Sequence, residues 1–300
     1  MPSINSASAQ REVEIQLGEC VTADQRPFVE QSIAAMIERH SERMTRQRTE
    51  NREHAELMRA IHAPLLEIIE QDQDASAALS VLRAKGQLDS GGDGVGRLPV
   101  RDSSRPGLLE LRGLEIIGVP YHYDWNWHDG DGELRPNMKA DRIAGTAKVA
   151  SHVIGSGTWV TGHAGIGVAM TTDQPIAAAA ARPARTTWDR YRASGAPIGG
   201  IAISELGTEV TVFEDGKLIA SGTDKRWRAR ASNGELKQHN TDGFGINDLI
   251  EVKWIMQPDH IYTLNVGAWT YCEYHDGVVG QSQAHAEVDA RFLFIGLDRS

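Results

Sequence analysis

The residues best suited to chemistry lie together in one short segment, YHYDWNWHDGDGE, at positions 121–133. Successive side chains of an extended strand point to opposite faces, so this segment has two faces of different character. One face is aromatic and comprises Tyr121, Tyr123, Trp125 and Trp127. The other face is polar and comprises His122, Asp124, Asn126 and His128. Each face predicts a different kind of site.

The aromatic face has two interpretations. Four large rings on one side of a strand can fill a hydrophobic core while the polar side is solvated or hydrogen-bonded between strands, and this interpretation is favoured. If the rings are exposed, they form a recognition platform, because aromatic rings offer wide apolar contact together with polar edges. Tyr123, Trp125 and Trp127 are therefore candidate binding residues.

The polar face offers ligands for a transition metal. His122-x-Asp124 resembles the His-x-Asp element of the double-stranded β-helix iron oxygenases, in which two His and one carboxylate form a facial triad with open positions. His285, on an expected late strand, is the candidate third ligand, and Arg291 beyond it could pair with an anion. The resemblance is two residues long and the surrounding sequence does not match that family, so it implies a site and no membership.

A second metal site is suggested by the loop that follows. Asp129, Asp131 and Glu133 place three carboxylates at alternate positions of a Gly-rich stretch, which suits calcium because it prefers several oxygen ligands from a flexible loop. The twelve-residue pattern of an EF-hand is missing, and a solvated turn is the favoured alternative. No cofactor motif occurs in the chain, so no cofactor is expected beyond calcium or a transition metal at these two positions.

Cations and aromatic residues alternate in two further segments, RPARTTWDRYR (182–192) and KRWRAR (225–230). In a regular strand, Arg226, Arg228 and Arg230 share one face, while Lys225 and Trp227 share the other. Such a row can bind a glycan, a phosphate or an acidic partner, with Trp227 and the three Arg as candidate binding residues. The alternative is a solvated strand edge that charge protects from pairing.

Composition excludes several classes of function. A formal net charge of −10 argues against general nucleic-acid binding, which needs a dense cationic surface. No apolar run approaches the roughly 18 residues of a membrane-spanning helix, and no secretory signal is recognisable. We therefore expect synthesis in the cytoplasm, with release or incorporation into a particle by another route. Cys20 and Cys272 are expected to be free thiols, and a bond between them is left open.

The first part of the chain is predicted to be helical. Residues 1–23 form an arm in which Val13, Ile15 and Leu17 alternate as in a stray strand. From Asp24, as N-cap, a helical segment extends over residues 24–86, with a break at Ala63-Pro64 and an end at Gly86. Its middle, HSERMTRQRTENREH, is almost wholly polar. Such a helix buries no wide face, so it is either a projecting stalk that pairs with its own copies as a coiled coil or a hairpin that turns in the polar middle.

Residues 87–107 are Gly-rich and predict a linker, and residues 108–300 predict an all-β domain. About ten short alternating segments without intervening helices favour antiparallel sheets in a sandwich or jelly roll, so the fold class is α+β by segments. Within this domain only Pro175–Tyr191, with its alanine run, is expected to be helical. PDHIYTLNVGAW resembles the Greek-key corner of immunoglobulin-like domains, which implies that the Tyr262 hydroxyl bonds to the upstream backbone.

These features predict a non-enzymatic assembly or recognition protein, such as a structural component of a particle or fibre. The helical part would mediate oligomerisation or docking onto a larger assembly, and the β domain would bind a surface or ligand. One alternative is a metal-dependent enzyme on a jelly-roll scaffold that uses His122, Asp124 and a distal His. Another is a toxin or effector built from a helix and a sandwich. No catalytic motif supports an enzyme, so an enzyme is the less favoured class.

Overall fold

The computed structural model describes residues 12–78, 81, 115–131, 136–154, 158–241, 245–247, 250–277 and 280–299. Its one long helix, α1 (Arg26–Gln71), has 46 residues and is followed by antiparallel sheets, so the fold is mixed α+β. Pro27 stands in the first turn of α1, where a missing N–H loses no helical hydrogen bond. The predicted linker 87–107 lies outside the described residues.

The helix α1 is continuous through Pro64, so the predicted break at Ala63-Pro64 and the predicted hairpin are both wrong. A proline inside a helix leaves the carbonyl four residues earlier without its helical partner. Here that carbonyl belongs to Ala60, and both Ala60 and Pro64 are exposed, so water can replace the lost hydrogen bond. The exposure of this part of α1 thus lowers the cost of the lost hydrogen bond.

The end of α1 is set by Asp72. Its Oδ1 accepts hydrogen bonds from the backbone N–H groups of Asp74 (3.0 Å) and Ala75 (3.1 Å), which caps a second helical stretch over residues 73–78.

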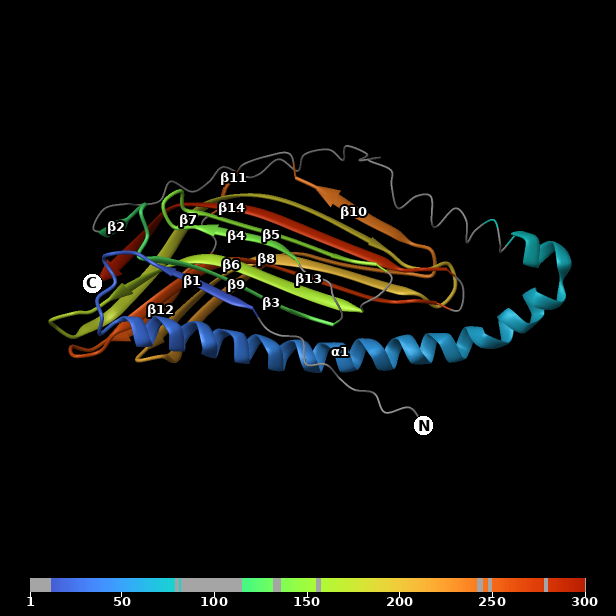
Figure 1. Ribbon diagram of the computed structural model, residues 1–300, viewed down its shortest axis with the longest axis horizontal. Helices are drawn as coiled ribbons and strands as arrows, with labels where there is room; N and C mark the ends of the chain where they lie inside the picture. Colours follow the sequence, from blue (N-terminus) through green and yellow to red (C-terminus); the bar gives the residue numbers. More distant parts are fainter. Residues whose placement is uncertain are drawn as a thin grey trace.

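The strands form two sheets (Figure 1). The first sheet has six strands in the order β1 (Val13–Leu17), β3 (Tyr123–Gly130), β6 (Trp159–Met170), β13 (Tyr262–His275), β8 (Ile201–Glu214) and β9 (Lys217–Ser232). The second sheet has eight strands, and its main path is β10 (Leu236–Asn240), β7 (Ile176–Ser194), β14 (Gln283–Arg299), β5 (Thr146–Val153) and β4 (Asn137–Asp141). Off this path, β11 (Gly245–Asn247) and β12 (Val252–Met256) pair with β7, and β2 (Glu115–Ile117) pairs with β14.

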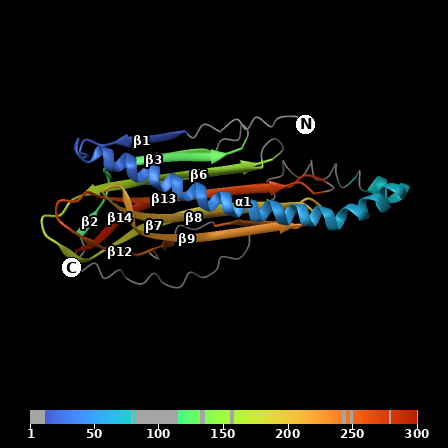
Figure 2. The same ribbon diagram turned by 90° about the horizontal axis from the view of Figure 1, so that it is seen from below.

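The two sheets pack against each other in a sandwich-like arrangement. Ile166 and Val266 of the first sheet share one buried cluster with Val149 and Val288 of the second sheet. The helix α1 lies lengthwise on the other face of the first sheet, as Figures 1 and 2 both show. The first sheet is therefore covered on both faces, by the second sheet and by α1.

The expected helix at Pro175–Tyr191 is wrong, because these residues belong to β7, a 19-residue strand. Ala179 and Ala181 are fully buried against the first sheet, in the same cluster as Val212 and Leu264. Small side chains fit where the two sheets approach closely, and this packing overrides the helix propensity of alanine. The alternation of β7 was hidden in the sequence because both of its faces carry alanine at this point.

Two local expectations are confirmed. Val13, Ile15 and Leu17 lie in β1, which pairs with β3 at the edge of the first sheet. The Tyr262 hydroxyl accepts a hydrogen bond from the upstream backbone N–H of Gln257 (2.7 Å), and it donates to Glu214 (2.6 Å). The Tyr262 hydroxyl thus binds the backbone of the turn before β13, as the sequence predicted.

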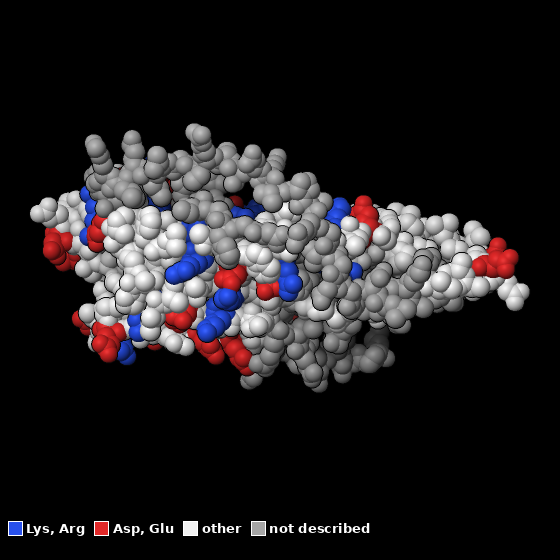
Figure 3. Space-filling view, turned by 90° about the horizontal axis from the view of Figure 1, so that it is seen from above, with Lys and Arg blue, Asp and Glu red and all other residues white. Residues whose placement is uncertain are grey.

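The outer face of the second sheet carries charges of both signs, which lie side by side in Figure 3. Lys148 pairs with Asp289, and Arg190 pairs with Glu287 at 2.5 Å. Exposed pairs of this kind contribute little to stability, about 0–1 kcal/mol each, so this face is a solvated surface of balanced charge.

Both cysteines are free thiols, with Cys20 exposed and Cys272 buried. Among the described residues, no helix has the length and apolar composition needed to cross a membrane.

Candidate functional site at the helix–sheet interface

The aromatic row of β3 lies beneath α1. Tyr123, Trp125 and Trp127 are each 0% exposed, and they share a buried cluster with Ile33 and Met36 of α1. The three candidate binding residues are therefore covered by the helix and do not form an exposed platform in this structure. Burying rings of this size contributes apolar contact between α1 and the sheet.

Glycines in the neighbouring strands make room for these rings. A Cβ atom at Gly165 would lie 2.5 Å from the Trp125 ring, and one at Gly167 would lie 2.1 Å from the Tyr123 ring. A Cβ at Gly267 of β13 would also reach Trp125, at 2.7 Å. The rings of β3 thus lie across the backbones of β6 and β13, which only glycine at these positions allows.

A chain of hydrogen bonds crosses from α1 to the sheet at His40. Arginine carries only donors, so Arg43 Nη2 donates to His40 Nδ1 at 3.1 Å, and the neutral His40 ring carries its hydrogen on Nε2. That Nε2 lies 3.1 Å from His163 Nε2, which must accept. The His163 hydrogen is then on Nδ1, which donates to Glu209 Oε1 at 3.1 Å. The order Arg43, His40, His163, Glu209 fixes the tautomers of both imidazoles.

The histidine pair is enclosed on all sides. The His163 ring stacks on Trp127 with centroids 4.0 Å apart and planes 9° apart, and His40 meets Trp127 edge-on at 5.3 Å. Burial lowers the pKa of both imidazoles well below their usual value, and the nearby Arg43 lowers both further. Burial raises the pKa of Glu209. Both imidazoles are therefore neutral near pH 7.

Farther along α1, two buried carboxylates of the sheet bind polar residues of the helix. Glu205 of β8 is 1% exposed and accepts from Gln47 Nε2 at 2.8 Å, with Lys225 at 2.8 Å and Arg228 at 3.1 Å beside it. These groups balance the charge of a carboxylate that would otherwise be costly to bury.

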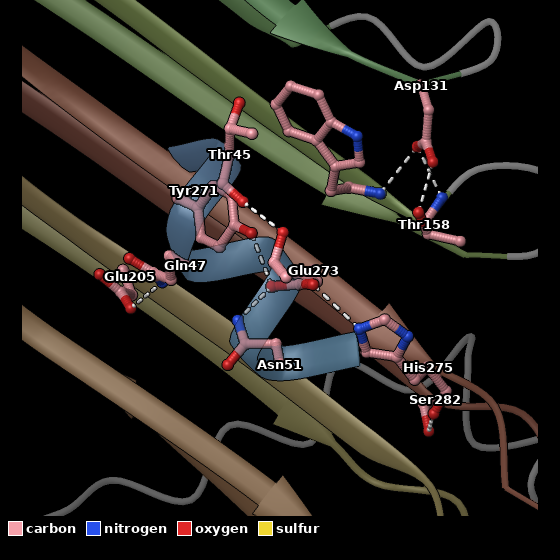
Figure 4. Close-up of polar contacts among 12 residues, drawn as sticks. Thr45, Gln47, Asn51, Asp131, Thr158, Glu205, Tyr271, Glu273, His275 and Ser282 are labelled. Atoms are coloured by element: carbon pink, nitrogen blue, oxygen red, sulfur yellow. Dashed lines mark hydrogen bonds and ion pairs between the residues drawn. The ribbon is translucent and has the colours of Figure 1, made fainter. Parts of the chain in front are cut away.

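The second carboxylate is Glu273 of β13, which is 2% exposed (Figure 4). It accepts from Asn51 Nδ2 at 2.5 Å and from the Tyr271 hydroxyl at 2.6 Å, and His275 Nε2 lies 2.9 Å away. Tyr271, Glu273 and His275 alternate along one strand, so their side chains share the face that α1 covers.

The polar middle of α1 is explained by these contacts. His40, Arg43, Gln47 and Asn51 follow one another at steps of three and four, so they lie along one side of the helix. That side faces a sheet surface that carries Glu205, Glu209 and Glu273. Sequence reasoning missed this polar seam because it searched for apolar side chains at helical spacing. The detectable signal was a carboxylate at an inward position of strands that are otherwise apolar.

The residues of the predicted transition-metal site are not brought together. His122 Nδ1 accepts from the backbone N–H of Ala169 (3.1 Å), and Asp124 accepts from that of Arg142 (2.9 Å). His285 belongs to β14 in the other sheet, where its ring lies 5.8 Å from that of His152. Across the residues that the structure describes, no group of three or more His, Cys, Asp and Glu side chains could hold a metal ion. The separation of the two sheets is the physical reason that the triad does not form.

The predicted calcium loop is only partly described, because Glu133 lies outside the described residues. Asp131 accepts hydrogen bonds from the backbone N–H groups of Thr158 (2.7 Å) and Trp159 (2.8 Å) and from the Thr158 hydroxyl (Figure 4). Asp129 accepts from Gly130 N–H (3.0 Å) and from the Ser41 hydroxyl of α1 (3.4 Å). The two carboxylates thus hold neighbouring chain segments in place.

The expected division of faces in β9 is wrong because of a β-bulge. The register with β8 shifts between Leu206 and Gly207. Trp227 pairs with Leu206 and Lys225 pairs with Gly207, so Arg226 is the extra residue of the bulge. Beyond the bulge, the faces are exchanged relative to a regular strand. Arg228 pairs with Glu205 and Arg230 with Ile203, so Lys225, Arg228 and Arg230 all lie on the side of the sheet that α1 covers.

Arg226 and Trp227 face the second sheet instead. Asp189 of β7 is fully buried and accepts from Arg226 Nε at 2.5 Å and from Trp227 Nε1 at 2.6 Å. The Trp227 ring also packs 4.1 Å from the His239 ring and 5.7 Å from the Tyr191 ring. Two of the candidate anion- or glycan-binding residues are therefore engaged in joining the sheets.

The interface between α1 and the first sheet is the most concentrated set of buried ionisable groups among the described residues. Its ionisable side chains pair with one another across the interface, whereas the buried indole N–H groups of Trp125, Trp127 and Trp269 have no hydrogen-bond partner among the described residues. No protein-family model matches the chain, and no curated protein sequence is similar to it.

Proposed function

We propose that the protein is a non-enzymatic docking and recognition protein in which α1 is the docking element. The observation that carries this proposal is an apolar seam near the C-terminal end of α1. Its residues are strongly exposed: Leu57 57%, Ile61 57%, Leu65 48% and Ile68 64%. Steps of four, four and three place them along one side of the helix, as in a helix that packs on a partner.

The position of the seam supports docking. The C-terminal part of α1 extends past the ends of the strands (Figures 1 and 2), whereas its earlier turns lie on the first sheet. A row of large apolar side chains in water is unfavourable by roughly 25 cal/mol per Å², so covering it stabilises a complex. A projecting end is also accessible to a partner without displacement of the sheets.

Charge favours a basic partner over a second copy. The row of α1 beside the seam, at positions 53, 56, 60, 64 and 67, carries Glu53, Glu56 and Glu67 and no cation. An antiparallel second copy would bring the same acidic row against this one, which is repulsive. A partner whose apolar strip is bordered by Lys or Arg complements both the seam and its border.

Two synthetic amphipathic helical peptides with the same leucine seam test this proposal, one bordered by Lys and the other by Glu. Fluorescence anisotropy with the full chain should show binding of the Lys-bordered peptide and at least tenfold weaker binding of the Glu-bordered one. The double variant Leu57→Glu/Ile61→Glu should lose the binding. Ala63→Glu adds a charge at an exposed position on the opposite side of the helix, so it is the matched control and should bind normally.

Light scattering completes the test. A monomer that binds the Lys-bordered peptide through the seam agrees with the proposal. A dimer that Leu57→Glu/Ile61→Glu dissociates would assign the seam to a second copy and overturn the basic partner. A monomer that binds neither peptide would overturn the docking role of the seam altogether.

A further inference from the structure

The middle of α1 is fastened to the first sheet by hydrogen bonds between buried polar groups, and His40 and His163 are at the centre of this interface. We propose that proton uptake by the His40–His163 pair releases α1 from the sheet, so that α1 is an acid-operated cover of the aromatic face below it. This inference does not depend on the partner proposed for the end of α1.

The two contacts between Arg43 and His163 each already have one donor and one acceptor. A proton on His40 Nδ1 would face the N–H of Arg43 across the present 3.1 Å contact. A proton on His163 Nε2 would face the His40 Nε2–H across the other 3.1 Å contact. Shifting the His40 hydrogen to Nδ1 relieves the second conflict only by creating the first. Thr161 Oγ1 is the neighbouring acceptor, at 3.2 Å from His163 Nε2 and 3.4 Å from His40 Nε2, because its own hydrogen is donated to the Thr270 carbonyl. An added proton therefore either sets two donors against each other or replaces the His40–His163 contact by a bond to Thr161, and either change disrupts the closed interface.

The surrounding charges do not compensate for that proton. The charged groups that face the pair are Arg39 and Arg43 from α1, Asp129 from β3, Glu209 from β8 and Lys225 from β9. Arg43 contacts His40 and Glu209 contacts His163 directly, and β6 and β13 contribute Thr161 and Trp269. Two carboxylates are thus set against three cations before either histidine is charged.

The direction of the pH effect follows from the lowered pKa of both imidazoles. When α1 is released, the two rings titrate near their ordinary value of about 6.5, whereas in the docked state they stay neutral. The docked state is therefore fully favoured above about pH 6.5 and loses up to tenfold in population per pH unit and per histidine below it. The raised pKa of Glu209 acts in the opposite direction, but one carboxyl opposes two imidazoles.

Release would uncover Trp127, one of the candidate binding residues, and the neighbouring Trp269. Trp127 stacks on His163, and Trp269 lies 6.5 Å from both imidazoles by ring centroids, so both rings lose their cover when the helix leaves. The core and the platform interpretations of the aromatic row then describe two states of one surface. An aromatic face that opens in acid suits an apolar or amphipathic partner.

Hydrogen exchange and tryptophan quenching by acrylamide test the proposal on the full chain at pH 7.5 and pH 5. We expect the amides of residues 36–51 to lose at least tenfold in protection at pH 5, with stronger quenching, while the amides of β13 stay protected. His40→Gln/His163→Gln should abolish this change, because glutamine keeps a donor and an acceptor and takes up no proton. His62→Gln on the same helix bonds only within α1 in the wild type, so it is the control and should behave as wild type.

If the double variant does not fold, His40→Gln alone carries the test and should reduce the pH dependence. Unchanged protection of α1 at pH 5 would overturn the proposal. Simultaneous loss of protection in α1 and β13 would also overturn it, because the whole domain would then be unfolding. A His62→Gln variant that abolishes the acid response would place the sensor outside the pair.

Discussion

The side chain of Asn51 on α1 donates a hydrogen bond of 2.5 Å to the carboxylate of Glu273 on β13, across 222 positions of sequence. Asn51 and Glu273 are both almost completely buried. The contact joins the polar side of the helix to the central part of the first sheet. It shows that α1 is specified by polar complementarity as well as by the aromatic packing near its N-terminal end.

Asn51→Ala should therefore destabilise the protein measurably. Removing the amide leaves the buried Glu273 carboxylate one donor short, at a cost of about 1–3 kcal/mol. Arg52→Ala, at the adjacent exposed position, should change the free energy of unfolding by less than about 0.5 kcal/mol. Urea denaturation of both variants measures the difference, and equal effects would show that the Asn51–Glu273 bond contributes nothing.

Gly165→Ala should be among the most damaging small substitutions. The new Cβ would lie 2.4 Å from the Val266 carbonyl and 2.5 Å from the Trp125 ring, so the strands or the ring must shift, at a cost of about 1–3 kcal/mol or more. Gly118→Ala is the matched control, because no atom lies within 4 Å of its new Cβ. Thermal unfolding compares the two, and a normal Tm for Gly165→Ala would mean that Trp125 does not lie on β6.

Arg226 and Arg228 should respond very differently to alanine substitution. Arg226→Ala leaves the buried carboxylate of Asp189 without its cation, and breaking a buried pair in this way costs about 3–5 kcal/mol. Arg228 is 49% exposed, so its pair with Glu205 should contribute about 1 kcal/mol or less. Denaturation of the two variants decides between the bulged strand and a regular strand, in which both arginines would be equivalent.

The two thiols should differ in reactivity. Burial raises the pKa of the Cys272 thiol, and its side chain is fully enclosed, whereas Cys20 is exposed. Titration with a chromogenic disulfide at pH 8 should label one thiol quickly in the native protein and a second only in denaturant. Rapid labelling of both thiols in the native protein would place Cys272 at the surface.

Much of this fold could be predicted from local periodicity. Alternation identified most strands of the two sheets, and a helical segment was predicted to start at Asp24, close to Arg26 where α1 begins after Gln25 as the N-cap residue. The tyrosine at position 262 was predicted to bond to the upstream backbone, and it does so through Gln257. Each of these predictions depends on residues that are close together in the sequence, where spacing alone determines geometry.

The errors share a different cause. Each concerns a feature that depends on contacts with distant parts of the chain, which the local sequence does not show. The bulge at Arg226 is a two-to-one pairing with β8, and nothing within KRWRAR shows it. The alanine run of β7 is a strand because another sheet packs on it, and propensity alone favours a helix. The polar seam of α1 has meaning only beside Glu205 and Glu273, which come more than 150 positions later.

The order of synthesis gives the polar middle of α1 a further consequence. The ribosome completes α1 before any strand of the first sheet except β1. The partners of Gln47 and Asn51, which are Glu205 and Glu273, are synthesised 158 and 222 residues later. At a synthesis rate of about 5–20 residues per second, Glu273 is added roughly 10–45 s after Asn51. A helix with an apolar middle would spend that time as an aggregation site on the nascent chain. The glutamine, asparagine, histidine and arginine side chains of α1 can remain hydrated until the first sheet has formed.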